Sequence, residues 1–156
     1  MSEWTELTKA VDACHSLFLH EIGEPQENVL RLVLVEGKLN PQGESREIGG
    51  VRFDELHRVE PTDSRNLELT WLHYVAYNVT NESFGKPESP ATSNSGRLLR
   101  RYTSSNFLDY VTRSTIATDE YPGPQIHVRV VSENHIIDVV SARLPTLRIL
   151  NADYYR

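Results

Sequence analysis

Two histidines, His127 and His135, lie eight residues apart in the segment PQIHVRVVSENHIIDVVSA, close to Glu133 and Asp138. Imidazole and carboxylate groups together form many metal sites and many acid–base pairs, so this spacing is the first place to look for chemistry. The same segment also has the pattern of two β-branched strands joined by the turn SENH, which is typical of an ordinary β-hairpin.

The hairpin interpretation places the charges in a simple way. With SENH as the turn, Arg129 faces Asp138 and the two charges inside apolar strands form an opposite-charge pair. The neighbouring cross-strand pairs are Val128 with Val139, Val130 with Ile137, and Val131 with Ile136. His127 falls on the face opposite these valines and His135 belongs to the turn, so one metal ion cannot bind both. The sequence predicts a structural hairpin and no metal site.

His73 is the second candidate. It lies in LELTWLHYVAYNV, where alternate residues from 67 to 79 are apolar and predict one long strand with His73 on the same face as Trp71. A buried histidine with one hydrogen bond is the simpler interpretation. The functional one is a neutral imidazole that acts as a base beside a carboxylate from another strand, as in a small hydrolase-type enzyme.

Other catalytic signatures are missing from the sequence. It contains no Gly-rich phosphate loop, CxxC, HExxH or nucleophile elbow, and the adjacent acids Asp119 and Glu120 lie in a loop where their side chains should diverge. We therefore expect no catalytic residue and no cofactor.

The elements that hold these residues follow from periodicity. Residues 3 to 22 predict an amphipathic helix capped by Ser2, and a short helix is expected at 106–114 behind the cap Ser104 or Ser105. Strands are expected at residues 28–36, at 46–59 with a bulge or sharp bend at Gly49 and Gly50, at 67–79, in RLLRRYTSS before the second helix, and in the final hairpin. The tail TLRILNADYYR is expected to add an edge segment. The expected fold is α+β: one domain over residues 1–156, with a single curved, mainly antiparallel sheet of about six strands.

The composition of the chain limits the kinds of partner that we expect it to bind. The formal net charge of −6 and the pI near 5.5 disfavour nucleic acid, which requires a basic surface. No apolar run approaches the length of a membrane span, Cys14 is the only cysteine, and the first residues do not resemble a signal peptide. A cytoplasmic location is expected; the oligomeric state stays open.

A resemblance to other proteins rests on three stretches of the sequence: LHYVAYNVTNESF, RLLRRYTSSNFLDYV, and YPGPQIHV followed by NHIIDVVS. Over roughly residues 67 to 142 the chain resembles a loose group of small bacterial α+β proteins that have no assigned activity. The resemblance implies a bacterial cytoplasmic α+β domain and transfers no site residue.

Two polar loops, residues 85–95 and 118–124, are the expected binding surface, because binding residues favour loops on a rigid scaffold. If both open at one end of the sheet, the acidic and aromatic surface suits a basic protein partner and comprises Phe84, Glu88, Asp119, Glu120 and Tyr121. Replacing Tyr121 with alanine should then weaken binding more than folding. The preferred function is a non-enzymatic protein-binding module, such as an immunity or inhibitor protein; the alternative is the hydrolase based on His73.

Overall fold

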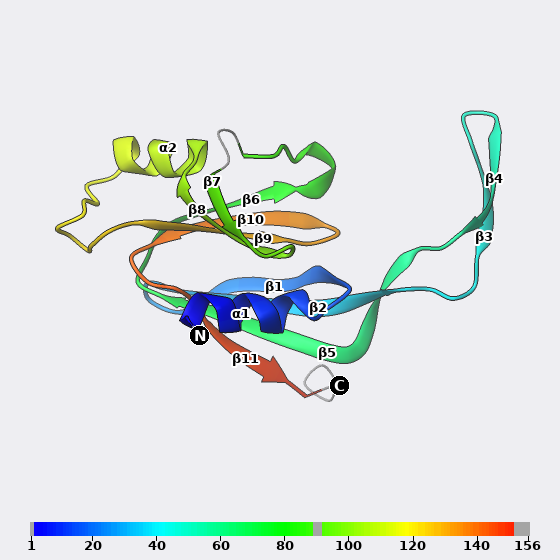
Figure 1. The fold of residues 1–156 in the computed structure, drawn as a ribbon, viewed down its shortest axis with the longest axis horizontal. Helices are drawn as coiled ribbons and strands as arrows, with labels where there is room; N and C mark the ends of the chain where they lie inside the picture. The colour runs from blue at the N-terminus through cyan, green and yellow to red at the C-terminus, as the bar shows by residue number, and fades with distance from the viewer. Residues whose placement is uncertain (1, 89–91, 152–156) are drawn as a thin grey trace.

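Two antiparallel sheets packed face to face form the body of the protein, and a separate β-hairpin projects from one end (Figure 1). The computed structural model describes residues 2–88 and 92–151, without the side chains of residues 63, 64 and 92–95. The first sheet has the order β1 (Ser16–Gln26), β2 (Val29–Leu39), β5 (Val59–Leu72) and β11 (Thr146–Leu150). The second has the order β6 (Tyr74–Asn81), β10 (His135–Ser141), β9 (Ile126–Val131), β8 (Leu99–Ser104) and β7 (Thr92–Ser95). The expectation of a single curved sheet is wrong.

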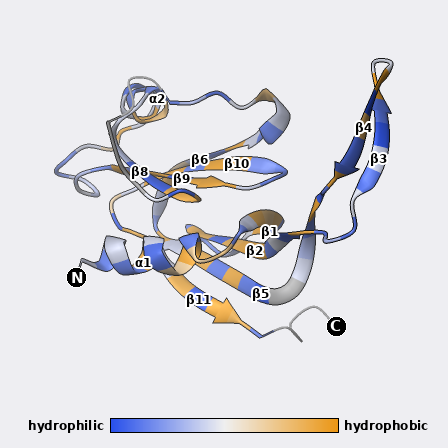
Figure 2. Cartoon of the chain, turned by 45° about the vertical axis from the view of Figure 1, so that its right-hand side comes forward, coloured by the Kyte–Doolittle hydropathy of each residue, from blue (hydrophilic) through white to orange (hydrophobic). Residues whose placement is uncertain are grey.

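The core lies between the sheets and is built from alternate residues of the central strands. Figure 2 shows the hydrophobic residues along these strands in orange. Trp71 is fully buried there, which confirms its predicted place on an apolar strand face. The other core residues on the strands are Leu17, Leu30, Leu32, Leu34, Leu67 and Leu69 of the first sheet and Leu99, Val128, Val130, Ile137 and Val139 of the second.

Helix α1 (Glu3–Asp12) is shorter than predicted. Its cap is confirmed, since the Ser2 side chain accepts a hydrogen bond from the Thr5 N–H, but the chain enters β1 at Ser16 instead of remaining helical to residue 22. Apolar residues over so short a stretch fit a helix or a strand, and pairing with β2 decides in favour of the strand. Asp12 ends the helix and accepts the backbone N–H groups of Arg97 and Leu98, which ties α1 to the turn before β8.

Helix α2 (Asn106–Ser114) has the predicted bounds. Ser105 is its cap and accepts from the Leu108 N–H, and the helix packs against β9 and β10 on the outer face of the second sheet. A short 3₁₀ turn, η1 (Glu82–Phe84), follows β6.

Two predicted strands are divided in the structure. Residues 46–59 form most of the hairpin β3 (Glu44–Ile48) and β4 (Val51–Leu56), and Gly49 and Gly50 are its turn, at φ of 59° and 79°. Positive φ angles at both central residues define the type I′ turn, whose twist matches that of the two strands in a two-residue hairpin. These glycines therefore reverse the direction of the chain between β3 and β4 and do not form a bulge within one strand. The predicted strand 67–79 is broken at His73, whose φ is 57°; β5 before it and β6 after it belong to different sheets.

The final hairpin has the predicted register. Arg129 pairs with Asp138, Val130 with Ile137 and Val128 with Val139 across β9 and β10. The tail supplies the expected edge segment as β11, beside β5, although residues 152–156 of the tail lie outside the described part. None of the helices in the described ranges has the length and apolar character that crossing a membrane requires.

Candidate functional site

A buried polar cluster lies on the outer face of the second sheet, beneath α2. Arg129 binds Asp138 through two contacts, Nε to Oδ1 at 2.7 Å and Nη2 to Oδ2 at 3.0 Å, so the predicted cross-strand pair is confirmed. The Nε2 atom of His127 lies 2.7 Å from the same Oδ1 atom. His127 and Arg129 are two apart on one strand, so both point to the face that carries Asp138.

Two further residues complete this cluster. Ser105 places its Oγ atom 2.7 Å from His127 Nδ1, and Glu88 accepts from Arg129 Nη2 at 3.1 Å and from the Asn106 N–H at 3.1 Å. We call these five residues the polar cluster: Glu88, Ser105, His127, Arg129 and Asp138. The sequence predicted one pair of these five residues, Arg129 with Asp138. The signal for the third member, His127, was its position two residues before Arg129, which places both on the same face of the strand.

Ser105, His127 and Asp138 lie in series, as in a nucleophilic triad. The three are almost completely buried, and Ser105 Oγ already accepts the Leu108 N–H as the cap of α2. A nucleophilic oxygen must reach a substrate and must have its proton removed by the histidine, whereas here the serine is enclosed under a helix. The arrangement holds α2 on the sheet.

The polar cluster also includes three residues that could hold a metal ion, because ligand atoms of Glu88, His127 and Asp138 lie within 4.8 Å of one another. The cation already present there is Arg129, which binds both carboxylates. Burial by itself raises the pKa of Asp138, but hydrogen bonds from His127 and Arg129 outweigh it and hold that pKa below its usual range. The guanidinium thus takes the place that a metal ion would need.

The residues predicted to bind a partner are not all brought together: Phe84 and Glu88 border one hollow, and Asp119, Glu120 and Tyr121 lie in a separate loop. In the β6–β10 register Asn81 pairs with His135 and Tyr74 with Ser141, so Phe84, which follows Asn81, lies at one end of the second sheet. Asp119, Glu120 and Tyr121 precede β9, whose first residue pairs with Ser141 at the other end. Phe84 therefore lies at the opposite end of the sheet from Asp119, Glu120 and Tyr121, whereas Thr92, near the end of the first predicted loop, pairs with Ser104 close to the start of β9. Glu88 is bound to Arg129 inside the polar cluster and is not part of an exposed surface.

His73 is exposed, contrary to the prediction that it faces the core. It borders a hollow of about 340 Å³ together with Tyr74, Ile116 and Tyr121. The lining is aromatic, aliphatic and amide in character; within the described residues it includes no carboxylate. A histidine base paired with an acid finds no support in this geometry.

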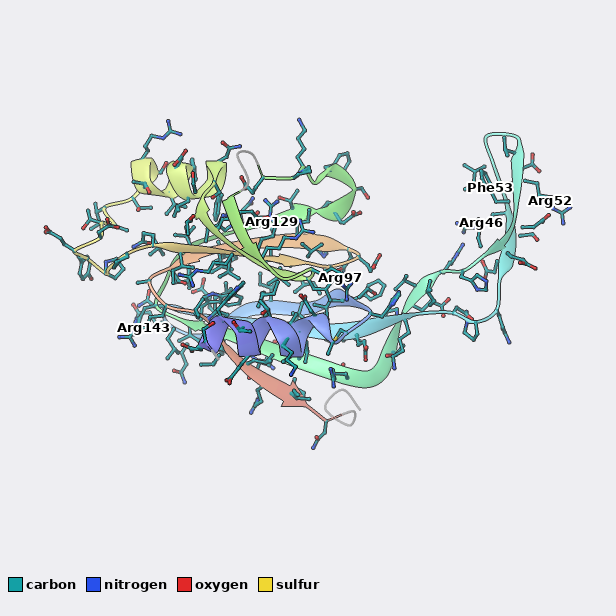
Figure 3. All side chains as sticks on the ribbon, in the orientation of Figure 1. Arg46, Arg52, Phe53, Arg97, Arg129 and Arg143 are labelled. Atoms are coloured by element: carbon teal, nitrogen blue, oxygen red, sulfur yellow. The ribbon has the colours of Figure 1, made fainter. Side chains whose placement is uncertain are left out.

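The hairpin of β3 and β4, which we call the arm, is the most exposed part of the structure. Ile48 pairs with Val51 and Arg46 with Phe53, so these four side chains share one face, with Ile48 59% exposed, Val51 56% and Phe53 43%. Arg46 and Phe53 lie on the side turned toward the sandwich, and Arg52 points the other way (Figure 3). An apolar face with one arginine is therefore left exposed on the side of the arm that is turned toward the sandwich.

No family model matches the chain, and neither a curated protein nor a solved structure does.

Proposed function

We propose that this chain is a non-enzymatic protein-binding module and that the arm makes the main contact with its partner. The observation that carries the proposal is the apolar face of the arm, where Ile48, Val51 and Phe53 remain exposed beyond the sandwich (Figure 1). Grouped exposed apolar residues mark interaction surfaces, whereas single ones are ordinary.

The arm's own structure supports this proposal. A two-stranded hairpin without further packing is only marginally stable in water. The neck gives it some support, since the Asn40 N–H donates to the Arg58 carbonyl at 2.7 Å and Arg58 forms an ion pair with Glu44 at 3.4 Å. Toward the tip Phe53 remains 43% exposed and Ile48 59% exposed in the described chain. A partner that covers this face would remove apolar area from water and stabilise the hairpin.

The hydrolase alternative is less well supported. His73 borders a hollow without a described acid, and the serine–histidine–aspartate series is enclosed beneath α2. An immunity or inhibitor protein in a bacterial cytoplasm is the form of binding module that fits the small size and the negative charge.

A photo-crosslinking amino acid at position 53 tests the proposal in cells that express the full chain. We expect a discrete adduct with one protein from position 53, and none from position 110, where Tyr110 is a comparably exposed aromatic residue on α2. If position 53 produces no adduct under any growth condition, the arm is not a binding element and the proposal fails.

A further inference from the structure

We infer that the arm binds a second copy of this chain, head to tail, with Phe53 seated in the hollow bordered by His73, Ile116 and Tyr121. This inference rests on the proposed function, because it names the partner that the arm contacts.

The arm and the hollow lie at opposite ends of the molecule. Strands β2 and β5 pair from Leu39 and Val59, where the arm begins, to Val29 and Leu72, next to the hollow. The ten steps from Val29 to Leu39 along β2, at about 3.3 Å rise each, separate these ends by about 33 Å. An arm cannot reach the hollow of its own chain, so the contact must be between two copies. Figure 1 shows the arm at one end and the chain segment after α2 at the other.

The hollow has the features of a receiving site for an aromatic side chain. Ile116 is 88% exposed and Tyr121 71% exposed at its rim. Its floor is fixed: the His73 N–H donates to the Asn28 carbonyl at 2.8 Å, which joins the β5–β6 corner to the β1–β2 turn. A rigid hollow with apolar rims is where an aromatic anchor contributes most to binding.

The arm as a whole carries more acidic than basic residues, but the cation on the face of Phe53, Arg46, is complementary to the two carboxylates beside the hollow. Asp119 and Glu120 occupy an exposed turn next to Tyr121, and Thr118 Oγ1 braces that turn by accepting the N–H groups of Glu120 at 3.3 Å and Tyr121 at 3.1 Å. On the arm, Arg52 is bound to Asp54 at 2.9 Å, whereas Arg46 forms no ion pair with any residue that the structure describes. Arg46 shares the face of Phe53, so seating Phe53 brings a cation toward the two carboxylates.

The chain's charge agrees with this pairing. With a net charge of −6, two copies repel each other at long range, and Arg46, on the face of Phe53, is the cation that offsets this repulsion at the contact. A head-to-tail contact uses two different surfaces, so it closes into a ring or continues as a filament.

The test uses two variants of the full chain and their mixture, followed by sedimentation velocity. The arm variant is Arg46→Glu with Phe53→Ser; the receiver variant is Asp119→Lys with Tyr121→Ser. We expect the wild-type chain to assemble and each variant alone to lose self-association by about 30-fold or more, as for a hot-spot residue. An equimolar mixture should form a dimer and nothing larger, because one variant keeps its hollow and the other keeps its arm. Matched unfolding midpoints for both variants and the wild type show that the losses do not come from misfolding.

Three outcomes overturn the inference. They are a wild-type chain that stays monomeric at every soluble concentration, a receiver variant that still assembles alone, and a mixture that forms no dimer. A monomeric wild type that nevertheless yields an adduct from position 53 with another protein removes only this inference and leaves the proposed function standing. A monomer without any adduct removes both.

Discussion

The polar cluster beneath α2 and the arm each present arginine beside an aromatic residue, yet their surroundings differ in every respect. Arg129 is buried, binds Asp138 and Glu88, and lies 5.8 Å from the Tyr102 ring centre. Arg46 is exposed beside Phe53 and has no ion pair among the described residues. Residue type alone would not distinguish them.

This difference separates the charges that stabilise the fold from those that are available for contact with another molecule. A buried charge that loses its partner costs several kcal/mol, so the polar cluster is retained for the fold whether or not it has another role. An exposed charge costs almost nothing to remove, so Arg46 affects stability little and is available for contact with another molecule. Stability and association should therefore respond to different substitutions.

Arg129→Ala should produce one of the largest losses of stability. It leaves two buried carboxylates without their cation, and removing one partner of such a pair costs about 3–5 kcal/mol. The matched control Arg46→Ala should change the free energy of unfolding by no more than about 0.5 kcal/mol. Urea unfolding of both variants measures this, and similar effects of the two substitutions would erase the distinction between the regions.

Trp71→Ala should cost about 3–5 kcal/mol of unfolding free energy, because it opens a cavity between the sheets. Its indole N–H has no hydrogen-bond partner in the structure, so Trp71→Phe should cost clearly less than Trp71→Ala. Neither substitution should alter self-association measured under conditions where the chain is folded. A loss below about 1 kcal/mol for the alanine variant would place this strand face in solvent.

Acid should weaken the polar cluster through Asp138. The pKa of Asp138 is lowered in the fold because the bonds from His127 and Arg129 outweigh the opposing effect of burial. The stability that this provides is fully present above the ordinary aspartate pKa of about 3.9 and is lost as the pH falls through the lower, folded value. Unfolding free energies from neutral pH to acid should thus fall less steeply for Asp138→Asn than for the wild type. Equal slopes would contradict the lowered pKa.

Ser105→Ala should have a smaller effect. It removes the cap of α2, worth about 0.5–2 kcal/mol, and also the hydrogen bond with buried His127. Ser2→Ala is the control, since Ser2 caps α1 from an exposed position and has no link to the polar cluster. Thermal unfolding should rank Ser105→Ala above Ser2→Ala, and the reverse order would show that the buried serine adds nothing beyond its cap.

The local sequence pattern was sufficient to predict the structure where residues close in the sequence are also close in space. The β9–β10 register follows from placing Arg129 against Asp138, and α2 begins at its capping serine. The division into two sheets depends on a positive φ at His73, a position where the alternation of LELTWLHYVAYNV continues without a break. Glu88 joins Arg129 from 41 positions away in the chain, and no local period signals such a contact.

Amide hydrogen exchange of the full wild-type chain over a dilution series is the most direct test of the central claim, that the polar cluster holds the fold and the arm holds a second copy. The account predicts that amides of β3, β4 and residues 115–122 gain protection as the concentration rises, while those of β9 and β10 stay equally protected throughout. Exchange in the arm that is independent of concentration, or protection that rises in β9 and β10 instead, would contradict it.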